Sequence, residues 1–589
     1  MKTIMIEWVH PGLLFIFGAF LIPLLKGRAR QAFLLLVPVL AIFAVASMSP
    51  GDYGNVTFTG RDLVFGHVDK LSIVFAWVFT IMSLIGMVYA FHVKEPGEHV
   101  AAFLYVGGSL GVVFAGDYFT LFMFWESMAF SSAYLVFARN RPRSVRAGYR
   151  YLLVHVTGGV FLMAGIVLNY LHTGSFVFGA VDPDSTGYYL IMTGFILNAA
   201  VPPLNAWLTD AYPEATVTGA VFMCAFTTKT AVYVLVRGFP GAEILIWLGV
   251  FMALYGVVYA VMENDARRLL AYHIVSQVGY MVAGVGIGTE LALNGSTSHA
   301  FSHIIYKALL FMGAGAVIYM TGRSKLTELG GIYRTMPVTV CLYMIGAFAI
   351  SAFPLFSGFV SKSMVIAAAS GDNLATATLL LTMASSGTFL HTGLKLPYYM
   401  FFGKDSGLRP KEPPLNMLIA MGMAAFLCIA IGVYPAPLYD LLPYAVDFEP
   451  YTSAHVTVSL GILMFTLLGF VWFLKDLDPE NTISLDTDWF YRKGAKAFMW
   501  LARGPVASYE AVVAELANTV VLRSLFATAR RGLWADINIV DAIVNGVAST
   551  IMGWGSTLRK MQTGTLTHYA VAMAAGIVIS ILVFSLRAM

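Results

Sequence analysis

The sequence predicts an all-α polytopic membrane protein with about sixteen transmembrane helices, two broken helices in inverted repeats and a C-terminal lateral amphipathic helix. Three observations predict this class. Of the 589 residues, 58% are hydrophobic and only 12% are charged, whereas soluble proteins average about 25% charged residues. Apolar runs long enough to cross a bilayer recur along the chain. Lys and Arg collect in the short loops between those runs.

Sixteen apolar runs approach the roughly 20 residues that a transmembrane helix needs. They lie near residues 4–25, 32–49, 71–93, 97–115, 118–138, 149–171, 187–206, 216–236, 241–262, 269–287, 299–321, 334–354, 375–402, 415–435, 454–474 and 568–587. The stretch 355–370 is apolar but too short to span alone, so it is expected to belong to a broken or re-entrant helix.

The basic loops all follow odd-numbered runs, and the other loops are acidic or neutral. Cytoplasmic loops carry the excess of Lys and Arg. The pattern predicts a protein of the bacterial inner membrane with both termini on the outer face. The basic residues are Lys26, Arg28, Arg30, Arg139, Arg141, Arg143, Arg146, Arg267, Arg268, Arg323, Lys325 and Arg334.

Two charged residues stand in the middle of apolar runs. Glu126 and Lys229 are each too far from the ends of their runs to reach the interface. Charges at that depth are expensive and indicate function, although a buried charge can also serve packing alone. Burial favours the neutral form of both groups, so each can change its protonation state. The two could form a switchable pair.

A second group of titratable residues has helical spacing. His299, His303 and Lys307 follow one another at i, i+4 and i+8, which places them on one face at intervals of about 6 Å. Three proton-exchanging groups in such a row are typical of a proton wire. His391 and Lys395 repeat the i, i+4 spacing just before Pro397, which should break the helix.

Further helix breaks are predicted at Pro202–Pro203 and in the segment from Pro354 to Lys362. Discontinuous helices at membrane depth line cavities and mark ion sites in transporters. His155 could join the relay, and Lys362 is a second accessory candidate. His273 is interpreted as structural. The three cysteines show no metal-binding or disulfide spacing.

Residues 475–566 are mixed polar and apolar, with no visible core of their own. A long amphipathic helix lying along the membrane fits this pattern.

The segments AVPPLNAWLTDAYPEATVTGAVFMCAFTTKTAVYVLVR, RRLLAYHIVSQVGYM and HAFSHIIYKALLFMGAGAVIY resemble the antiporter-like membrane subunits of respiratory complex I and of Mrp-type sodium/proton antiporters, the D branch of the Mrp proteins above all. The resemblance covers roughly residues 70–435. The tail resembles the lateral helix and anchor of the largest antiporter-like subunit of complex I. The resemblance implies a hydrated relay through the membrane centre formed by Glu126, Lys229, His299, His303, Lys307, His391 and Lys395, with Lys395 as the terminal ionisable residue of the second broken helix.

One position departs from the family. Aligning on PLNAW places Asn198 where the family usually has a lysine in the first broken helix. Asparagine cannot titrate, so either Lys229 becomes the partner of Glu126 or the first half works differently.

The expected regions are N-terminal membrane helices at 1–96, antiporter-like repeats at 97–240 and 241–403, core helices at 404–474, the lateral segment at 475–566 and a terminal anchor at 567–589. The first function hypothesis is translocation of H⁺ or Na⁺ within a hetero-oligomeric complex of membrane subunits in the lipid bilayer. The second is a non-conducting scaffold that anchors a soluble redox or inorganic-carbon module. No cofactor ligand set and no nucleic-acid-binding face are found.

Overall fold

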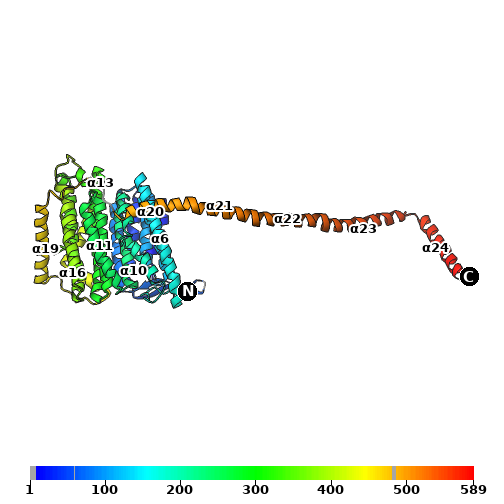
Figure 1. The fold of residues 1–589 in the computed structure, drawn as a ribbon, viewed down its shortest axis with the longest axis horizontal. Helices are drawn as coiled ribbons and strands as arrows, with labels where there is room; N and C mark the ends of the chain where they lie inside the picture. Colours follow the sequence, from blue (N-terminus) through cyan, green and yellow to red (C-terminus); the bar gives the residue numbers. More distant parts are fainter. Residues whose placement is uncertain (1–7, 59, 481–485, 589) are drawn as a thin grey trace. The chain divides into compact units, whose positions relative to one another are not determined.

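Long helices of the membrane unit run along a common direction in the computed structural model, which describes residues 8–58, 60–480 and 486–588 (Figure 1). The chain divides into two compact units, Met1–Trp489 and Phe490–Met589. The first unit contains every residue predicted to take part in the relay.

The first half of this unit consists of helices and one strand pair. They are α1 (Pro11–Leu21), α2 (Gly27–Ala46), β1 (Gly51–Phe58), β2 (Arg61–Val68), α3 (Lys70–Tyr89), α4 (Pro96–Phe114), α5 (Tyr118–Phe137), α6 (Pro142–Thr173), α7 (Tyr188–Asn198), α8 (Ala206–Glu214), α9 (Val217–Ala225) and α10 (Thr227–Gly238), with short 3₁₀ turns η1 (Ile22–Leu24) and η2 (Ala90–His92).

The second half is helical throughout its regular elements. They are α11 (Glu243–Met262), α12 (Ala266–Ile287), α13 (Glu290–Thr321), η3 (Leu326–Glu328), η4 (Ile332–Arg334), α14 (Pro337–Ile350), α15 (Ser357–Gly371), α16 (Ala375–Thr388), the π-helical η5 (Phe389–Lys395) and η6 (Tyr398–Phe402), α17 (Leu415–Val433), α18 (Ala436–Leu441) and α19 (Ser453–Trp472).

Within the described residues, thirteen helices are long and apolar enough to cross a membrane. Three of the predicted spans correspond to shorter apolar helices, Pro11–Leu24, Tyr188–Asn198 and Pro337–Ile350. Two of these end at irregular turns, because α7 and α8 are separated by residues 199–205 and α14 and α15 by residues 351–356. The prolines at 202, 203 and 354 lie in these turns, where a missing amide donor costs no helical hydrogen bond.

Helices α11 and α12 approach each other closely. A Cβ at Gly256 would collide with the Ser276 backbone, and one at Gly279 would collide with Gly249. Small residues allow such backbone contact between membrane helices. Glycine at these positions therefore allows the close packing of α11 against α12, which border the buried polar residues described below.

Strands β1 and β2 form an antiparallel hairpin that the all-α prediction omitted. His67 on β2 lies 2.6 Å from the Asp52 carboxylate and 3.6 Å from that of Asp69, the N-cap of α3. Asp69 in turn accepts two hydrogen bonds from Arg237 on α10, at 2.9 and 2.8 Å. Hydrogen bonding to Asp69, assisted by Asp52, raises the pKa of His67 above its usual 6.5.

The second unit is a succession of helical segments. They are α20 (Asp488–Leu501), η7 (Ala502–Val506), α21 (Ala507–Leu516), η8 (Ala517–Leu522), α22 (Arg523–Ala535), η9 (Asp536–Val540), α23 (Asp541–Met561) and α24 (Leu566–Arg587), of which η7, η8 and η9 are π-helical. The run Arg492–Met561 is one helix of 70 residues, about 105 Å long at 1.5 Å per residue. No buried residue is found in the described part of this unit beyond residue 490, so it has no core of its own.

Candidate functional site

A first group of polar residues gathers around Glu126 of α5. Its Oε1 atom is buried and has no hydrogen-bond partner among the described residues. The carboxylate lies against Gly159 of α6, where any Cβ would collide with Oε1. His155 lies one turn earlier on α6, and its ring packs 4.5 Å from the Trp207 ring. Glycine at 159 therefore provides the space that Glu126 occupies.

Asn198 belongs to this first group. It is the last residue of α7, is fully buried and faces His155. Neither atom of its amide makes a hydrogen bond of ordinary geometry within the described chain. The structure therefore brings together Glu126, His155 and Asn198 on the α5–α6–α7 side of the bundle.

Three buried lysines share an environment that the sequence did not reveal. Lys229 Nζ donates to the Cys224 carbonyl at 2.6 Å, one residue before the end of α9. Lys362 Nζ donates at 2.9 Å to the carbonyl of Ile350, the last residue of α14.

Lys395 Nζ completes this pattern by donating at 2.5 Å to Val261, one residue before the end of α11. The last carbonyls of a helix lack intrahelical partners, and the helix C-terminus carries partial negative charge. Each ammonium group is thus stabilised by a helix end.

Glu126 and Lys229, which the sequence suggested as a possible switchable pair, are not in direct ionic contact among the described residues. None of the ion pairs within 4.0 Å among the described residues involves either side chain. Lys229 instead bonds Cys224 and the Thr228 hydroxyl, at 3.1 Å. The irregular residue Phe226, between α9 and α10, leaves the Cys224 carbonyl free for the ammonium group.

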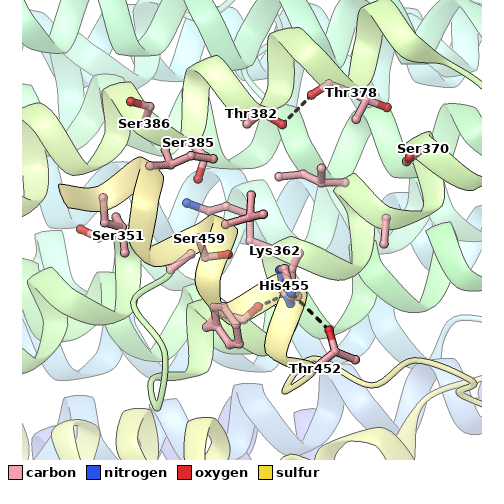
Figure 2. A pocket seen from close by; sticks show the side chains of 18 of the residues that line it. Ser351, Lys362, Ser370, Thr378, Thr382, Ser385, Ser386, Thr452, His455 and Ser459 are labelled. Atoms are coloured by element: carbon pink, nitrogen blue, oxygen red, sulfur yellow. Dashed lines mark hydrogen bonds between the residues drawn. The ribbon is translucent and has the colours of Figure 1, made fainter. Parts of the chain in front are cut away.

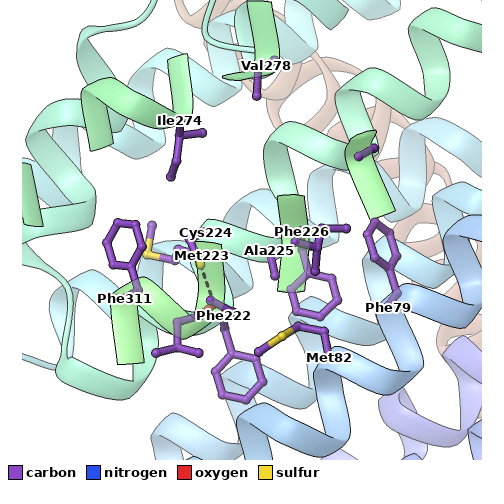
Figure 3. Packing of buried hydrophobic residues seen from close by; sticks show 14 of the residues in the cluster. Phe79, Met82, Phe222, Met223, Cys224, Ala225, Phe226, Ile274, Val278 and Phe311 are labelled. Carbon is purple, nitrogen blue, oxygen red and sulfur yellow. Dashed lines mark hydrogen bonds between the residues drawn. The ribbon is translucent and has the colours of Figure 1, made fainter. Parts of the chain in front are cut away.

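The surroundings of this junction are apolar. Figure 3 shows Cys224 and Phe226 among Phe79, Met82 and Phe311. Water cannot solvate an ammonium group in such a setting, so the carbonyl at the helix end is its principal partner.

Hydroxyl groups lie between the first group and Lys229. Tyr151, whose ring is 4.2 Å from His155, makes a 2.7 Å hydrogen bond with Ser132. Its hydroxyl also interacts with Thr227, which lies 2.5 Å from the Tyr105 hydroxyl. Thr227 is the first residue of α10, two positions before Lys229.

The central group is formed by α13. His299, His303 and Lys307 are fully buried on one face, and the rings of the two histidines are 6.1 Å apart. His299 contacts the Ser361 hydroxyl at 3.2 Å. Both ring nitrogens of His303 and the Lys307 ammonium lack hydrogen-bond partners in the described chain. The spacing inferred from sequence is therefore realised, with unpartnered groups at its centre.

His273 was interpreted as structural, yet it lies in this cluster. Its ring packs edge-on against His391 at 5.0 Å, and both of its nitrogens are unpartnered among the described side chains. His273 and His391 both lie within electrostatic reach of Lys307 and Lys362. No clear signal in the sequence identifies His273, because it lies only four residues after the start of its predicted run.

Lys362, an accessory candidate from the sequence, lies beside the second irregular turn of the bundle. It lies on α15 just after the irregular turn 351–356 and bonds the end of α14. Lys395 lies at the end of η5, within electrostatic reach of Glu263 and Asp478. The π-helical geometry of η5 carries the chain past this point without the predicted break before Pro397.

Lys362 also borders a cavity of about 410 Å³ between α15, α16 and α19. Figure 2 shows the lysine beside hydroxyl side chains and His455. The hydroxyl-bearing residues are Ser351, Ser363, Ser370, Thr378, Thr382, Ser385, Ser386, Thr452 and Ser459. Such a lining can hold water. No group of three His, Cys, Asp or Glu suited to a metal ion is found in the described ranges.

The sequence and the fold of the chain are similar to those of known membrane proteins. The family described as NADH:quinone oxidoreductase/Mrp antiporter, transmembrane, matches residues 115–389. One of the Na⁺/H⁺ antiporter subunits of Alkalihalophilus pseudofirmus is 28% identical, over 70% of this chain and 92% of the relative. One of the F₄₂₀H₂ dehydrogenase subunits of Methanosarcina mazei is 25% identical, over 96% and 98%.

The fold is shared with a chain of the membrane-bound sulfane sulfur reductase, an archaeal respiratory membrane complex. The TM-score is 0.69 at 22% identity, covering 98% of this chain and 100% of that one. The match includes the C-terminal unit. By the family match over residues 115–389 and these relatives, the chain is similar to the antiporter-like membrane subunits of the NADH:quinone oxidoreductase and Mrp antiporter family.

Proposed function

We propose that this chain is an ion-translocating membrane subunit of a multisubunit complex and that the ion moving through its buried cluster is H⁺. The observation that carries the proposal is the unpartnered set of Lys307, His303 and His273. Buried polar groups are otherwise nearly always hydrogen-bonded to protein or water. Leaving three proton-exchanging groups unpaired is costly and is explained by internal water that links them.

The chemistry of the cluster favours protons over sodium. Its side chains offer amine and imidazole nitrogens, which exchange protons readily. Hard cations prefer carboxylate, carbonyl and water oxygens. The proposed route runs from Lys229 past His303 and Lys307 to Lys362, where the hydroxyl-lined cavity provides water.

The remaining residues have proposed places on this route. His299 joins Lys229 to Lys362, and His391 joins the central group to Lys395. Glu126 and His155 belong to the first group. This group is connected to the proposed proton path through the hydroxyls of Tyr151 and Thr227.

Neighbouring membrane subunits are the proposed partners of the C-terminal unit. Large apolar side chains such as Trp500, Trp534 and Trp554 are exposed along its 70-residue helix. A helix of that length with no core requires an apolar partner. We propose that it lies laterally along other subunits at the cytoplasmic face of a bacterial inner membrane, with both termini of the chain outside.

The test of the proposed function is Lys307→Met in the intact complex reconstituted into liposomes. We expect proton transport to fall at least about a hundredfold, the smaller effect typical of removing a positioned proton-transfer group. Assembly should persist, because Met fills a similar volume without a buried charge. The control is Lys404→Met, which changes an exposed lysine. Equal rates in the two variants would refute the proposal.

The scaffold hypothesis retains one supporting observation. The first group contains no lysine, since Asn198 occupies the position where the family usually has one. A correctly assembled wild-type complex that performs its redox or exchange chemistry without any ion flux through this chain would favour the scaffold.

A further inference from the structure

Asp486 is a buried carboxylate from the last residues of the membrane unit. Its side chain accepts hydrogen bonds from the hydroxyls of Tyr255 on α11 and Tyr272 on α12, the latter at 2.5 Å. Only 4% of the residue is exposed. The sequence prediction of a lateral amphipathic segment at 475–566 gave no reason to expect a buried carboxylate here.

The depth of this carboxylate is unusual. Tyr255 lies seven residues before the end of α11, and Tyr272 lies six residues after the start of α12. At 1.5 Å per residue, the backbones of the two tyrosines that bind Asp486 lie about 10 Å inside the ends of their helices. A carboxylate at that depth is expensive unless hydrogen bonds compensate its lost hydration.

The hydrogen bonds around Asp486 extend to the turn between α7 and α8. Asn205, fully buried in that turn, donates to the Tyr255 hydroxyl at 3.4 Å and accepts from the Thr487 hydroxyl at 3.3 Å. Thr487 also donates its backbone amide to Asp486 at 2.5 Å. Asp486 and Thr487 thus contact α11, α12 and the α7–α8 turn, all of which lie more than 200 residues earlier in the chain.

The turn matters because it positions the first polar group. Two residues beyond Asn205, Trp207 donates to the Leu197 carbonyl at 3.0 Å and packs against His155. Leu197 adjoins Asn198. A shift of the turn would therefore displace both His155 and Asn198.

We propose that Asp486 is a positioning residue, which holds the α7–α8 turn, and with it the His155–Asn198 group, through Tyr255 and Asn205. This inference rests on the proposed function for its effect on transport. The physical anchor is independent of that function. Asp486 touches no transported ion in this role and acts only through the turn.

The experiment compares Asp486→Asn with Asp476→Asn in the intact complex, because Asp476 is an exposed carboxylate ten residues earlier. Amide hydrogen exchange of residues 196–208 and proton transport in liposomes are measured on the same preparations. For Asp486→Asn we expect faster exchange in the turn and roughly tenfold slower transport, the scale of losing a hydrogen bond to a charged acceptor. Asp476→Asn should change neither.

Tyr255→Phe provides a second variant that keeps the carboxylate and removes one shared hydroxyl. It should reproduce both effects, and combining it with Asp486→Asn should add little, since both act through one contact. Unchanged exchange in both variants would overturn the anchor. Faster exchange with wild-type transport would overturn the positioning role. If the wild-type complex carries no ions, the proposed function fails, and the exchange result alone decides the anchor.

Discussion

Buried lysines in this protein take their counter-charge from the backbone. Lys229, Lys362 and Lys395 each donate to a carbonyl in the last two residues of a helix. Lys307 has no such partner in the described chain. The difference separates three lysines with fixed positions from one whose ammonium is free to exchange partners.

Asn198 occupies an equivalent place, because α7 ends there. We expect Asn198→Lys to be tolerated in assembly, since a helix C-terminus stabilises a cation. The variant should also change the pH profile of transport, because a new titratable group then stands beside His155. The measurement is transport rate against pH, with Asn198→Met as the matched uncharged control. Identical profiles for all three proteins would mean that the first group does not take part.

Residue-level prediction from sequence succeeded where helical spacing was enough. His299, His303 and Lys307 lie on one buried face as their spacing predicts. Contacts between elements could not be read in the same way. Spacing along the sequence could not show whether Glu126 and Lys229 touch. Lys229 bonds a backbone carbonyl, an acceptor that every sequence position supplies.

At the scale of elements, the hairpin β1–β2 is attached to the helices by a titratable network. His67 bridges Asp52 on β1 and the Asp69 cap of α3, and Arg237 of α10 also faces Asp69. Burial opposes ionisation of Asp69, but hydrogen bonds from His67 and Arg237 outweigh it and hold the pKa of Asp69 below its usual value. The hairpin is thereby linked to the helix that carries Lys229.

This network predicts a pH dependence with a definite sign. The pKa of His67 is raised above 6.5 in the folded protein. The stabilisation that protonated His67 gives to the folded hairpin is therefore complete below pH 6.5. It is lost as the pH rises through the raised pKa of His67 in the folded protein. We expect exchange protection of residues 51–68, corrected for intrinsic rates, to weaken as the pH rises above 6.5. His67→Gln should flatten this dependence, and a slope that survives the substitution would assign it to another group.

Helix boundaries could be predicted where the hydropathy of the sequence changes. They were missed where backbone geometry and packing determine the secondary structure. The long apolar runs gave α3, α12 and α13 within a few residues apart from an early start of α13. The hairpin was missed because its two eight-residue strands lie between two hydrophobic helices and were interpreted as a loop. The π-helical path of η5 past Pro397 depends on packing that periodicity does not encode.

At the scale of the whole molecule, two truncations separate the role of the C-terminal unit from the role of Asp486. Deleting 490–589 removes the exposed helical unit and keeps Asp486, whereas deleting 480–589 removes both. We expect both truncations to weaken assembly with partner subunits, because both lose the apolar surface of the 70-residue helix. Only the longer deletion should accelerate exchange in residues 199–205. Blue-native electrophoresis and hydrogen exchange measure the two effects. Full assembly of either truncated chain would contradict the proposed lateral contact.

The class of the molecule could be predicted from composition and loop charge, since both reflect the solvent around it. The limits of its membrane unit could not. The boundary falls at Trp489 and Phe490, beyond the expected start of the lateral segment at 475, because Asp486 finds its donors in α11 and α12.

The lysine–helix-end arrangement has a consequence for sequence drift. A counter-charge provided by a carboxylate disappears with one codon change, whereas the carbonyl of Ile350, Val261 or Cys224 persists whatever side chain stands there. Substitutions at these three positions can alter packing, but they leave the acceptor in place. The stabilisation of the three lysines therefore depends on where the helices end. Only insertions, deletions or prolines that move those helix ends can remove it.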